Sequence, residues 1–151
     1  MSGLLLDTSF VSVFAPDRQE PPEEFLRWVD AQRARGNWYL PAIAVAELVR
    51  GVTKLRRAGA VTKAGRLGLW LETTLNEFEQ RILPVDAATA REAGQLADRV
   101  SARGHDPGLA DILVAATARV NGLDVLTVNT RHFAMLEVEH FNPLRGEFPP
   151  G

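Results

Sequence analysis

The sequence predicts an α/β fold in which helices cover both faces of a parallel sheet. Short apolar runs of three or four residues alternate along the chain with longer segments whose apolar residues recur at helical spacing. The short runs lack the in–out alternation of a strand with one wet face, which is typical of parallel strands buried on both sides. With 151 residues, 46% of them hydrophobic and 24% charged, the chain has the size and composition of one globular domain, expected to span residues 1–151.

The first part of the chain supplies two strands and one helix. Residues 3–6 form the first expected strand, which ends at Asp7, and a polar loop is expected after it. The Pro-Pro-Glu-Glu segment at 21–24 begins a helix, because proline suits the first turn and acids stabilise the positive end of the helix dipole. Gly36 ends this helix, and residues 38–40 form the second strand.

Two amphipathic helices follow the second strand. The first runs from Ala42 to a break at Gly59, with a single apolar face made of Val45, Leu48, Val49, Val52 and Leu55. The second runs to about Gln80, and its inward residues are Leu67, Trp70, Leu71, Leu75 and Phe78. Because these helices carry more large apolar residues than so narrow a sheet can cover, we expect part of their surface to form a symmetric homodimer interface.

The second half of the chain repeats the alternation. The expected elements are a strand at 82–85, a helix at 87–102, a helix at 109–121, a strand at 125–128 and a last short strand within 134–143. Pro84 indicates an edge strand, because proline has no backbone donor. Asp86 is expected to cap the first of these helices, and Gly122 to end the second.

Composition excludes several classes of function. The chain has no cysteine, which excludes a disulfide scaffold, a cysteine-ligated zinc site and thiol catalysis. No apolar run approaches the length of a membrane span, and the N-terminus shows no basic leader segment. We therefore expect a cytoplasmic protein.

Positive charge is unevenly distributed on a chain whose net charge is −2. No acidic residue occurs between Glu47 and Glu72, and this stretch carries six cations: Arg50, Lys54, Arg56, Arg57, Lys63 and Arg66. Such a stripe is typical either of a surface that contacts phosphate or of a solvated helix face, and charge alone leaves both open.

Three acids stand in otherwise apolar surroundings. Asp7 ends the first strand, Glu47 lies in the helix after the second strand, and Asp111 lies in the first turn of the helix before the fourth strand. In an open parallel sheet, strand C-termini and the helices that follow them share the edge where ligands bind. Asp7 and Glu47 fall on this edge directly, as does Asn129 after the fourth strand. Asp111 joins them if the N-terminus of its helix packs over the same edge.

Carboxylates that converge without a lysine or arginine suit hard divalent cations such as Mg²⁺ or Mn²⁺. The chemistry that such a site supports is metal-assisted hydrolysis of a phosphodiester, which needs no covalent nucleophile. This agrees with the absence of a nucleophile elbow and of a nucleotide-binding P-loop.

Five segments resemble, in order, the motifs of PIN-domain nucleases, and in particular those of the VapC and FitB toxins of bacterial toxin–antitoxin pairs. These segments are 5–9, 45–51, 81–86, 110–118 and 127–133. The resemblance covers almost the whole chain, from about residue 4 to Pro143. It implies a three-layer α/β/α sandwich around a short parallel sheet.

The resemblance also implies function. It assigns metal binding to Asp7 and Asp111 and completion of the acidic cluster to Glu47, and we expect the amide of Asn129 to position water or substrate. The substrate implied is RNA, with Arg50, Lys54, Arg56 and Arg57 as candidate backbone contacts. The implied partners are a second copy of the chain and an antitoxin peptide that fills the active-site groove.

The chain departs from the family pattern at two positions. Asn129 stands where many relatives have a fourth acid, so a second metal would bind weakly, and His132 stands where many have Asp. The roles of His132, His105 and His140 stay open, whereas Thr8 and Ser9 are candidates to support the first acid or a water. A metal-dependent endoribonuclease is therefore the leading interpretation. The alternative is a catalytically weak PIN-like module that binds RNA or protein.

A phospho-acceptor receiver domain is disfavoured. That site needs a lysine near the end of a late strand, whereas the lysines of this chain, Lys54 and Lys63, lie in the middle helices.

Overall fold

The computed structural model describes residues 3–151 and contains a parallel sheet of five strands. The strands are β1 (Leu4–Leu6), β2 (Trp38–Pro41), β3 (Ile82–Leu83), β4 (Asp124–Leu126) and β5 (His140–Phe141). Their order is β3-β2-β1-β4-β5, and every neighbouring pair is parallel. The α/β prediction is confirmed, and β3 lies at an edge, as its following proline indicated.

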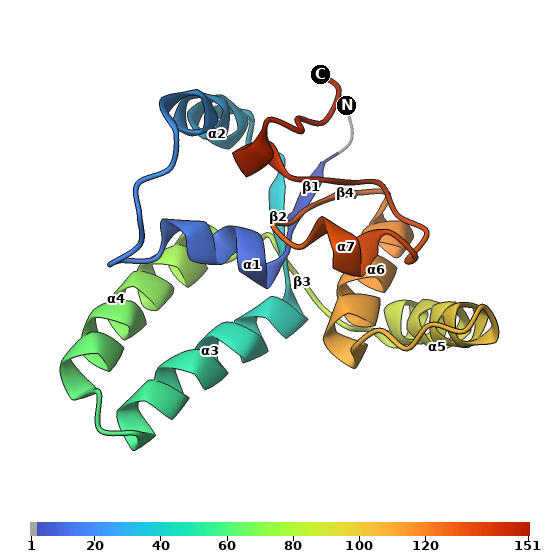
Figure 1. Cartoon of the computed structure of the whole chain (residues 1–151), viewed down its shortest axis with the longest axis horizontal. Coiled ribbons are helices and arrows are strands. Elements are labelled where there is room, and N and C mark those ends of the chain that lie inside the picture. Colours follow the sequence, from blue (N-terminus) through green and yellow to red (C-terminus); the bar gives the residue numbers. More distant parts are fainter. Residues whose placement is uncertain (1–2) are drawn as a thin grey trace.

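Helices lie on both faces of this sheet (Figure 1). They are α1 (Thr8–Val11), α2 (Glu23–Arg35), α3 (Ala42–Arg57), α4 (Val61–Glu77), α5 (Ala87–Ala102), α6 (Leu109–Asn121) and α7 (Thr130–Phe133), with short 3₁₀ turns at Ser12–Phe14 and Pro143–Arg145. The expected helix ends are present. Gly36 and Gly122 end α2 and α6 in the left-handed conformation, and the Asp86 carboxylate accepts the Thr89 N–H at 2.9 Å at the start of α5.

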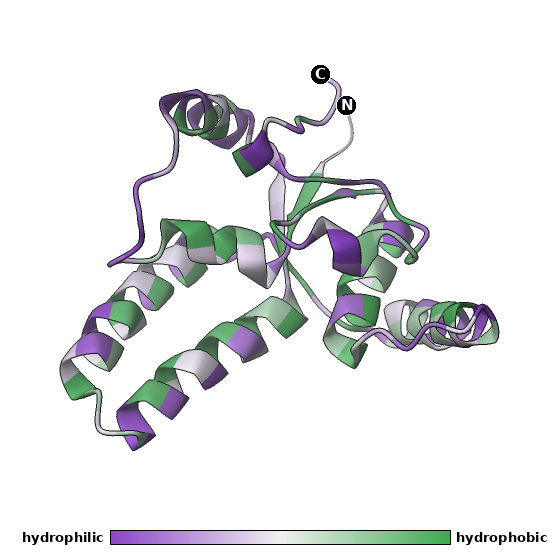
Figure 2. Cartoon of the chain, in the orientation of Figure 1, coloured by the Kyte–Doolittle hydropathy of each residue, from purple (hydrophilic) through white to green (hydrophobic). Residues whose placement is uncertain are grey.

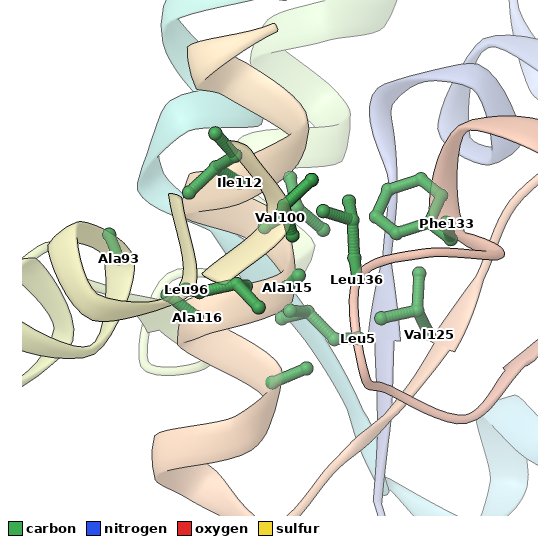
Figure 3. Close-up of a cluster of buried hydrophobic side chains, with 12 residues drawn as sticks. Leu5, Ala93, Leu96, Val100, Ile112, Ala115, Ala116, Val125, Phe133 and Leu136 are labelled. Carbon is green, nitrogen blue, oxygen red and sulfur yellow. The ribbon is translucent and has the colours of Figure 1, made fainter. Parts of the chain in front are cut away.

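The central strand β1 divides the core into two clusters because its side chains alternate between the faces of the sheet. Leu5 packs with buried residues of α5, α6 and the segment around Phe133 (Figure 3). Leu4 and Leu6 pack on the other face with residues of α1, α2 and β2. All three leucines are at most 3% exposed, so the sheet is buried on both sides and the molecule has three layers.

Helices α3 and α4 pack against each other as a hairpin that extends away from the sheet (Figure 1). Val52 and Leu71 are buried in this arm, where Gly68 of α4 faces Val52. Apolar and polar residues alternate along both helices (Figure 2). Val49 was predicted to share the apolar face of α3, but it is 44% exposed because it lies on a surface hollow with Arg50 and Lys54.

The structure corrects several other expected elements. The polar loop expected after Asp7 is instead α1 and a 3₁₀ turn, and Phe10 and Val11 of α1 are buried in the core. The fourth strand ends at Leu126 rather than Val128, and β3 is two residues long. The sequence did not predict the short helix α7. No helix within residues 3–151 is long and apolar enough to cross a membrane.

Candidate active site

The three predicted acids lie at the carboxyl edge of the sheet. Asp7 directly follows β1, and Glu47 lies in the second turn of α3, which begins where β2 ends. Helix α6 leads directly into β4, which runs parallel to β1, so the first turn of α6 lies at the same edge. The condition that the sequence set for Asp111 is therefore met.

Two hydroxyl groups hold the carboxylate of Asp7. Its Oδ2 accepts hydrogen bonds from Ser9 Oγ at 2.7 Å and from Thr127 Oγ1 at 2.9 Å. Its side chain is nearly fully buried, with the residue 5% exposed, and Oδ1 receives no hydrogen bond from the described residues. The protein thus fixes the Asp7 carboxylate through one of its two oxygens.

The same two hydroxyls fix the segment after β4. Ser9 Oγ accepts the backbone N–H of Val128 at 3.0 Å, and Thr127 Oγ1 accepts that of Asn129 at 2.9 Å. Sequence reasoning missed the role of Thr127. The available signal was a polar residue at the end of an apolar strand, and the structure shows that this residue is fully buried.

Glu47 has a different support. Its Oε1 accepts a hydrogen bond from Thr8 Oγ1 at 2.7 Å, and both the bond and the glutamate are exposed. Ser9 therefore supports the first acid as expected, whereas Thr8 supports the second, because α1 directs its hydroxyl toward α3.

The pKa of Asp111 is raised by burial and in part by the nearby charges of Asp7 and Glu47. Burial raises the pKa of this carboxyl above its ordinary value, and the charges of Asp7 and Glu47 raise it further. His132 acts in the opposite direction, with Nδ1 lying 3.1 Å from Asp111 Oδ2. Sequence reasoning did not find this contact, because it depends on α7.

The donor chemistry of this edge fits a hard divalent cation. Among the described residues, no lysine or arginine forms an ion pair with Asp7, Glu47 or Asp111. The mutual repulsion that raises the pKa of Asp111 is relieved by positive charge. Across residues 3–151, however, no three His, Cys, Asp or Glu side chains are placed to hold one ion between them. A pair of carboxylates completed by water is the arrangement that fits, because such cations keep several waters.

Asn129 directly precedes α7 at the same edge. Its side chain is exposed and makes no hydrogen bond to the described residues, and only its backbone N–H is tied to Thr127. Its predicted catalytic role stays a prediction.

The cations of α3 separate into two groups. Arg50, Lys54 and Arg57 line one surface hollow of about 480 Å³, on the turns that follow Glu47. Arg56 is also exposed, but its guanidinium lies beside Gly68 of α4 and outside that hollow. Three of the four predicted RNA contacts thus share a surface, and the fourth does not.

A groove of about 490 Å³ begins at Thr8 and Glu47 and continues between α3 and α4. Its walls are mainly apolar and include Leu55, Leu67 and Trp70, with Lys63 among the lining residues. The groove connects Glu47 to the inner side of the α3–α4 arm.

Comparisons with known proteins show the family to which the chain is related. The PIN domain matches residues 4–138 of the chain. The toxin FitB of Neisseria gonorrhoeae is 36% identical over 141 residues, which are 93% of this chain and 97% of that protein. The VapC ribonuclease Y4jK of Sinorhizobium fredii is 31% identical over 145 residues, covering 93% of this chain and 96% of the relative. The crystal structure of FitAcB from Neisseria gonorrhoeae contains a chain that superposes with a TM-score of 0.78 at 36% identity, covering 93% of this chain and 97% of that one.

Proposed function

The chain belongs to the PIN-domain family, and from this premise we propose that it is a metal-dependent endoribonuclease, the toxin of a toxin–antitoxin pair. The observation that carries the proposal is the meeting of Asp7, Glu47 and Asp111 at one edge of the sheet, where burial and like charge raise the pKa of Asp111. Carboxylates that converge without a lysine or arginine partner suit a divalent cation. We propose that a single nuclease domain spans residues 1–151.

In this proposal Asp7 and Asp111 hold Mg²⁺ or Mn²⁺. When bound, such a cation lowers the pKa of a water and offsets negative charge on the phosphoryl oxygens. The hydroxyls of Ser9 and Thr127 keep Asp7 in one orientation, and Thr8 does the same for Glu47. Glu47 is exposed and fixed at one oxygen only, which suits it to accept a proton from the attacking water. Asn129, at the same edge of the sheet, orients water or substrate.

The substrate in this proposal is RNA. Relatives that share about a third of this sequence are named ribonucleases. The surface formed by Arg50, Lys54 and Arg57 begins one helical turn after Glu47, so it can hold the phosphates of a strand whose cleaved bond lies at the acids.

The proposed partner is an antitoxin whose peptide occupies the groove between α3 and α4. The groove is lined by leucines and Trp70 and opens at Glu47, so an apolar segment seated there brings its end to the acids. A basic residue at that end would pair with the carboxylates and exclude the cation. A short reading frame for a DNA-binding protein beside the gene is the expected genetic sign of this partner.

The proposal is tested by incubating the purified protein with an end-labelled single-stranded RNA of mixed sequence and with DNA of the same sequence. We expect internal cleavage of the RNA in Mg²⁺ or Mn²⁺, and none in a chelator or on the DNA. Binding of RNA without cleavage under every metal condition would favour the alternative, a catalytically inactive PIN-like module.

A further inference from the structure

A pocket on the other side of Asp111 is not used by the mechanism above. It lies between the loop at 103–108 and α7, has a volume of about 360 Å³, and is lined by His105, Pro107, Asp111, Arg131, His132 and Met135. We propose that this α6–α7 pocket binds the nucleotide that flanks the cleaved phosphate, with Arg131 on its phosphate and its base against Pro107 and Met135. The proposal rests on the endoribonuclease function and specifies where the substrate lies.

The α6–α7 pocket lies beside the three acids. Asp111 lines the pocket, and the charges of Asp7 and Glu47 act on the Asp111 carboxyl. The hollow that Arg50, Lys54 and Arg57 line also includes Ala46, the neighbour of Glu47 in α3. Helix α3 and the α6–α7 pair flank the end of the sheet (Figure 1). A strand that contacts both surfaces therefore crosses the acids.

Arg131 differs from the neighbouring arginines because it has no acidic partner among the described residues. Arg99, Arg103 and Arg119, on the neighbouring helices, each pair with Glu92 or Glu137. Arg131 is exposed in the pocket and makes no ion pair or hydrogen bond with the described residues. The one acid in the lining besides Asp111 is Asp106. An unpaired guanidinium beside a phosphodiester-cleaving site fits a phosphate, which it can contact through two N–H groups.

The size and lining of the α6–α7 pocket suit a nucleobase. The volume lies within the range of small-ligand sites, roughly 300–1,000 Å³. Pro107 and Met135 are half-buried and give the pocket two apolar surfaces, one of them a polarisable thioether. The face of a nucleobase packs on such surfaces whatever its sequence, whereas His105 offers an imidazole for hydrogen bonding.

The first test compares Arg131→Gln with a matched control, Arg91→Gln. Arg91 is exposed and unpaired within residues 3–151. It lies away from the pocket, because the adjacent Glu92 pairs with Arg119, which is about two helical turns from Asp111 along α6. With a single-stranded RNA that the wild type cleaves, Arg131→Gln should raise KM roughly tenfold with kcat unchanged. The slope of log KM against log salt should fall by about 0.7, because one phosphate contact is lost. Arg91→Gln should change neither quantity.

The outcomes separate this proposal from the one on which it rests. A wild type that cleaves no RNA in either metal overturns both. A wild type that cleaves, together with an Arg131→Gln variant whose KM and salt slope are unchanged, overturns the pocket assignment alone. The assignment is also wrong if kcat falls at constant KM, because Arg131 would then act on the chemical step.

The second test concerns the base. Once the cut is mapped, an abasic nucleotide is placed on one side of it and then on the other. We expect KM to rise roughly tenfold on one side only, since stacking of one base is lost there. Met135→Ala should weaken binding of the intact RNA and abolish this difference, whereas the volume-conserving Met135→Leu should retain it. Equal effects on both sides, or none, would overturn the base contact.

Discussion

At the scale of single residues, the site depends on hydroxyls as much as on carboxylates. Ser9 and Thr127 each donate to Asp7 and each accept a backbone N–H from the segment after β4. The orientation of Asp7 and the path of the chain toward α7 are therefore set by the same two side chains.

Replacing Thr127 by Val tests this double role. The side chain is fully buried, and the change preserves its shape but removes the hydroxyl, so the Asn129 N–H loses its acceptor and Asp7 loses a donor. We expect a loss of about 1–3 kcal/mol in the free energy of unfolding, measured in urea, and weaker stabilisation by Mg²⁺ or Mn²⁺. Thr127→Ser keeps the hydroxyl and should retain most of the metal response. If Thr127→Val binds metal as the wild type does, the hydroxyl does not position Asp7.

The acids show what sequence reasoning could and could not find at the site. Asp7 and Glu47 were predicted to share one edge because their positions after strands follow from topology, whereas Asp111 was predicted to join them only if its helix packed over that edge. The contact of His132 with Asp111 and the hydroxyl of Thr127 on Asp7 join residues far apart in the chain, and nothing local in the sequence marks either pairing.

At the scale of elements, local signals decided which helices were predictable. Helices α2, α5 and α6 have their ends set by Gly36, Asp86 and Gly122, whose effects act within a few residues. Helices α1 and α7 have four residues each and carry no side-chain cap. They are held by the burial of Phe10 and Phe133 in the two core clusters, which only the folded molecule provides.

An ion-pair network joins α5, α6 and the segment before β5. A hydrogen bond from Arg119 holds the pKa of Glu92 below its ordinary value, and one from Arg99 does the same for Glu137. Carboxyls with lowered pKa values stabilise the fold above their unfolded pKa, and this contribution is lost as the pH falls through the folded pKa. Because these are surface pairs, each contributes at most about 1 kcal/mol.

Glu92→Gln should therefore lower the melting temperature at pH 7 but have less effect at acidic pH. Melting curves between pH 7 and pH 3 measure this, with Glu72→Gln on α4 as a control, since Glu72 is exposed and unpaired among the described residues. An equal loss at both ends of the pH range would show that the effect of Glu92 is not electrostatic.

The two groups of cations on α3 give a paired test of RNA binding. Changing both Arg50 and Lys54 to Gln should reduce the slope of log K against log salt by about 1.4, since each phosphate contact on a single strand contributes about 0.7. Arg56→Gln, whose guanidinium lies beside Gly68 of α4 and outside the hollow that Arg50 and Lys54 line, should leave the slope unchanged. If the double variant has the wild-type slope, α3 presents a solvated face and not an RNA surface.

At the scale of the whole molecule, the arm formed by α3 and α4 exposes apolar surface. Val61 is 63% exposed and Leu69 is 72% exposed on α4. We predict that this surface forms the interface of a homodimer, as the sequence composition suggested, so light scattering at micromolar concentration should give twice the mass of the 16.6 kDa chain. Leu69→Glu should yield monomers that remain folded. A monomeric wild type would contradict the assignment.

Thermal melting with and without metal measures whether Asp7 and Asp111 together hold one divalent cation, as we propose. Without metal, Asp7→Asn and Asp111→Asn each remove one of three mutually repelling charges, so neither variant should melt below the wild type. On addition of Mg²⁺ or Mn²⁺ the wild type should gain stability, because a ligand that binds only the folded state stabilises it. Both variants should gain much less, whereas Glu72→Gln should respond as the wild type does. If Asp7→Asn and Asp111→Asn respond to metal as fully as the wild type, these two carboxylates are not the ligands.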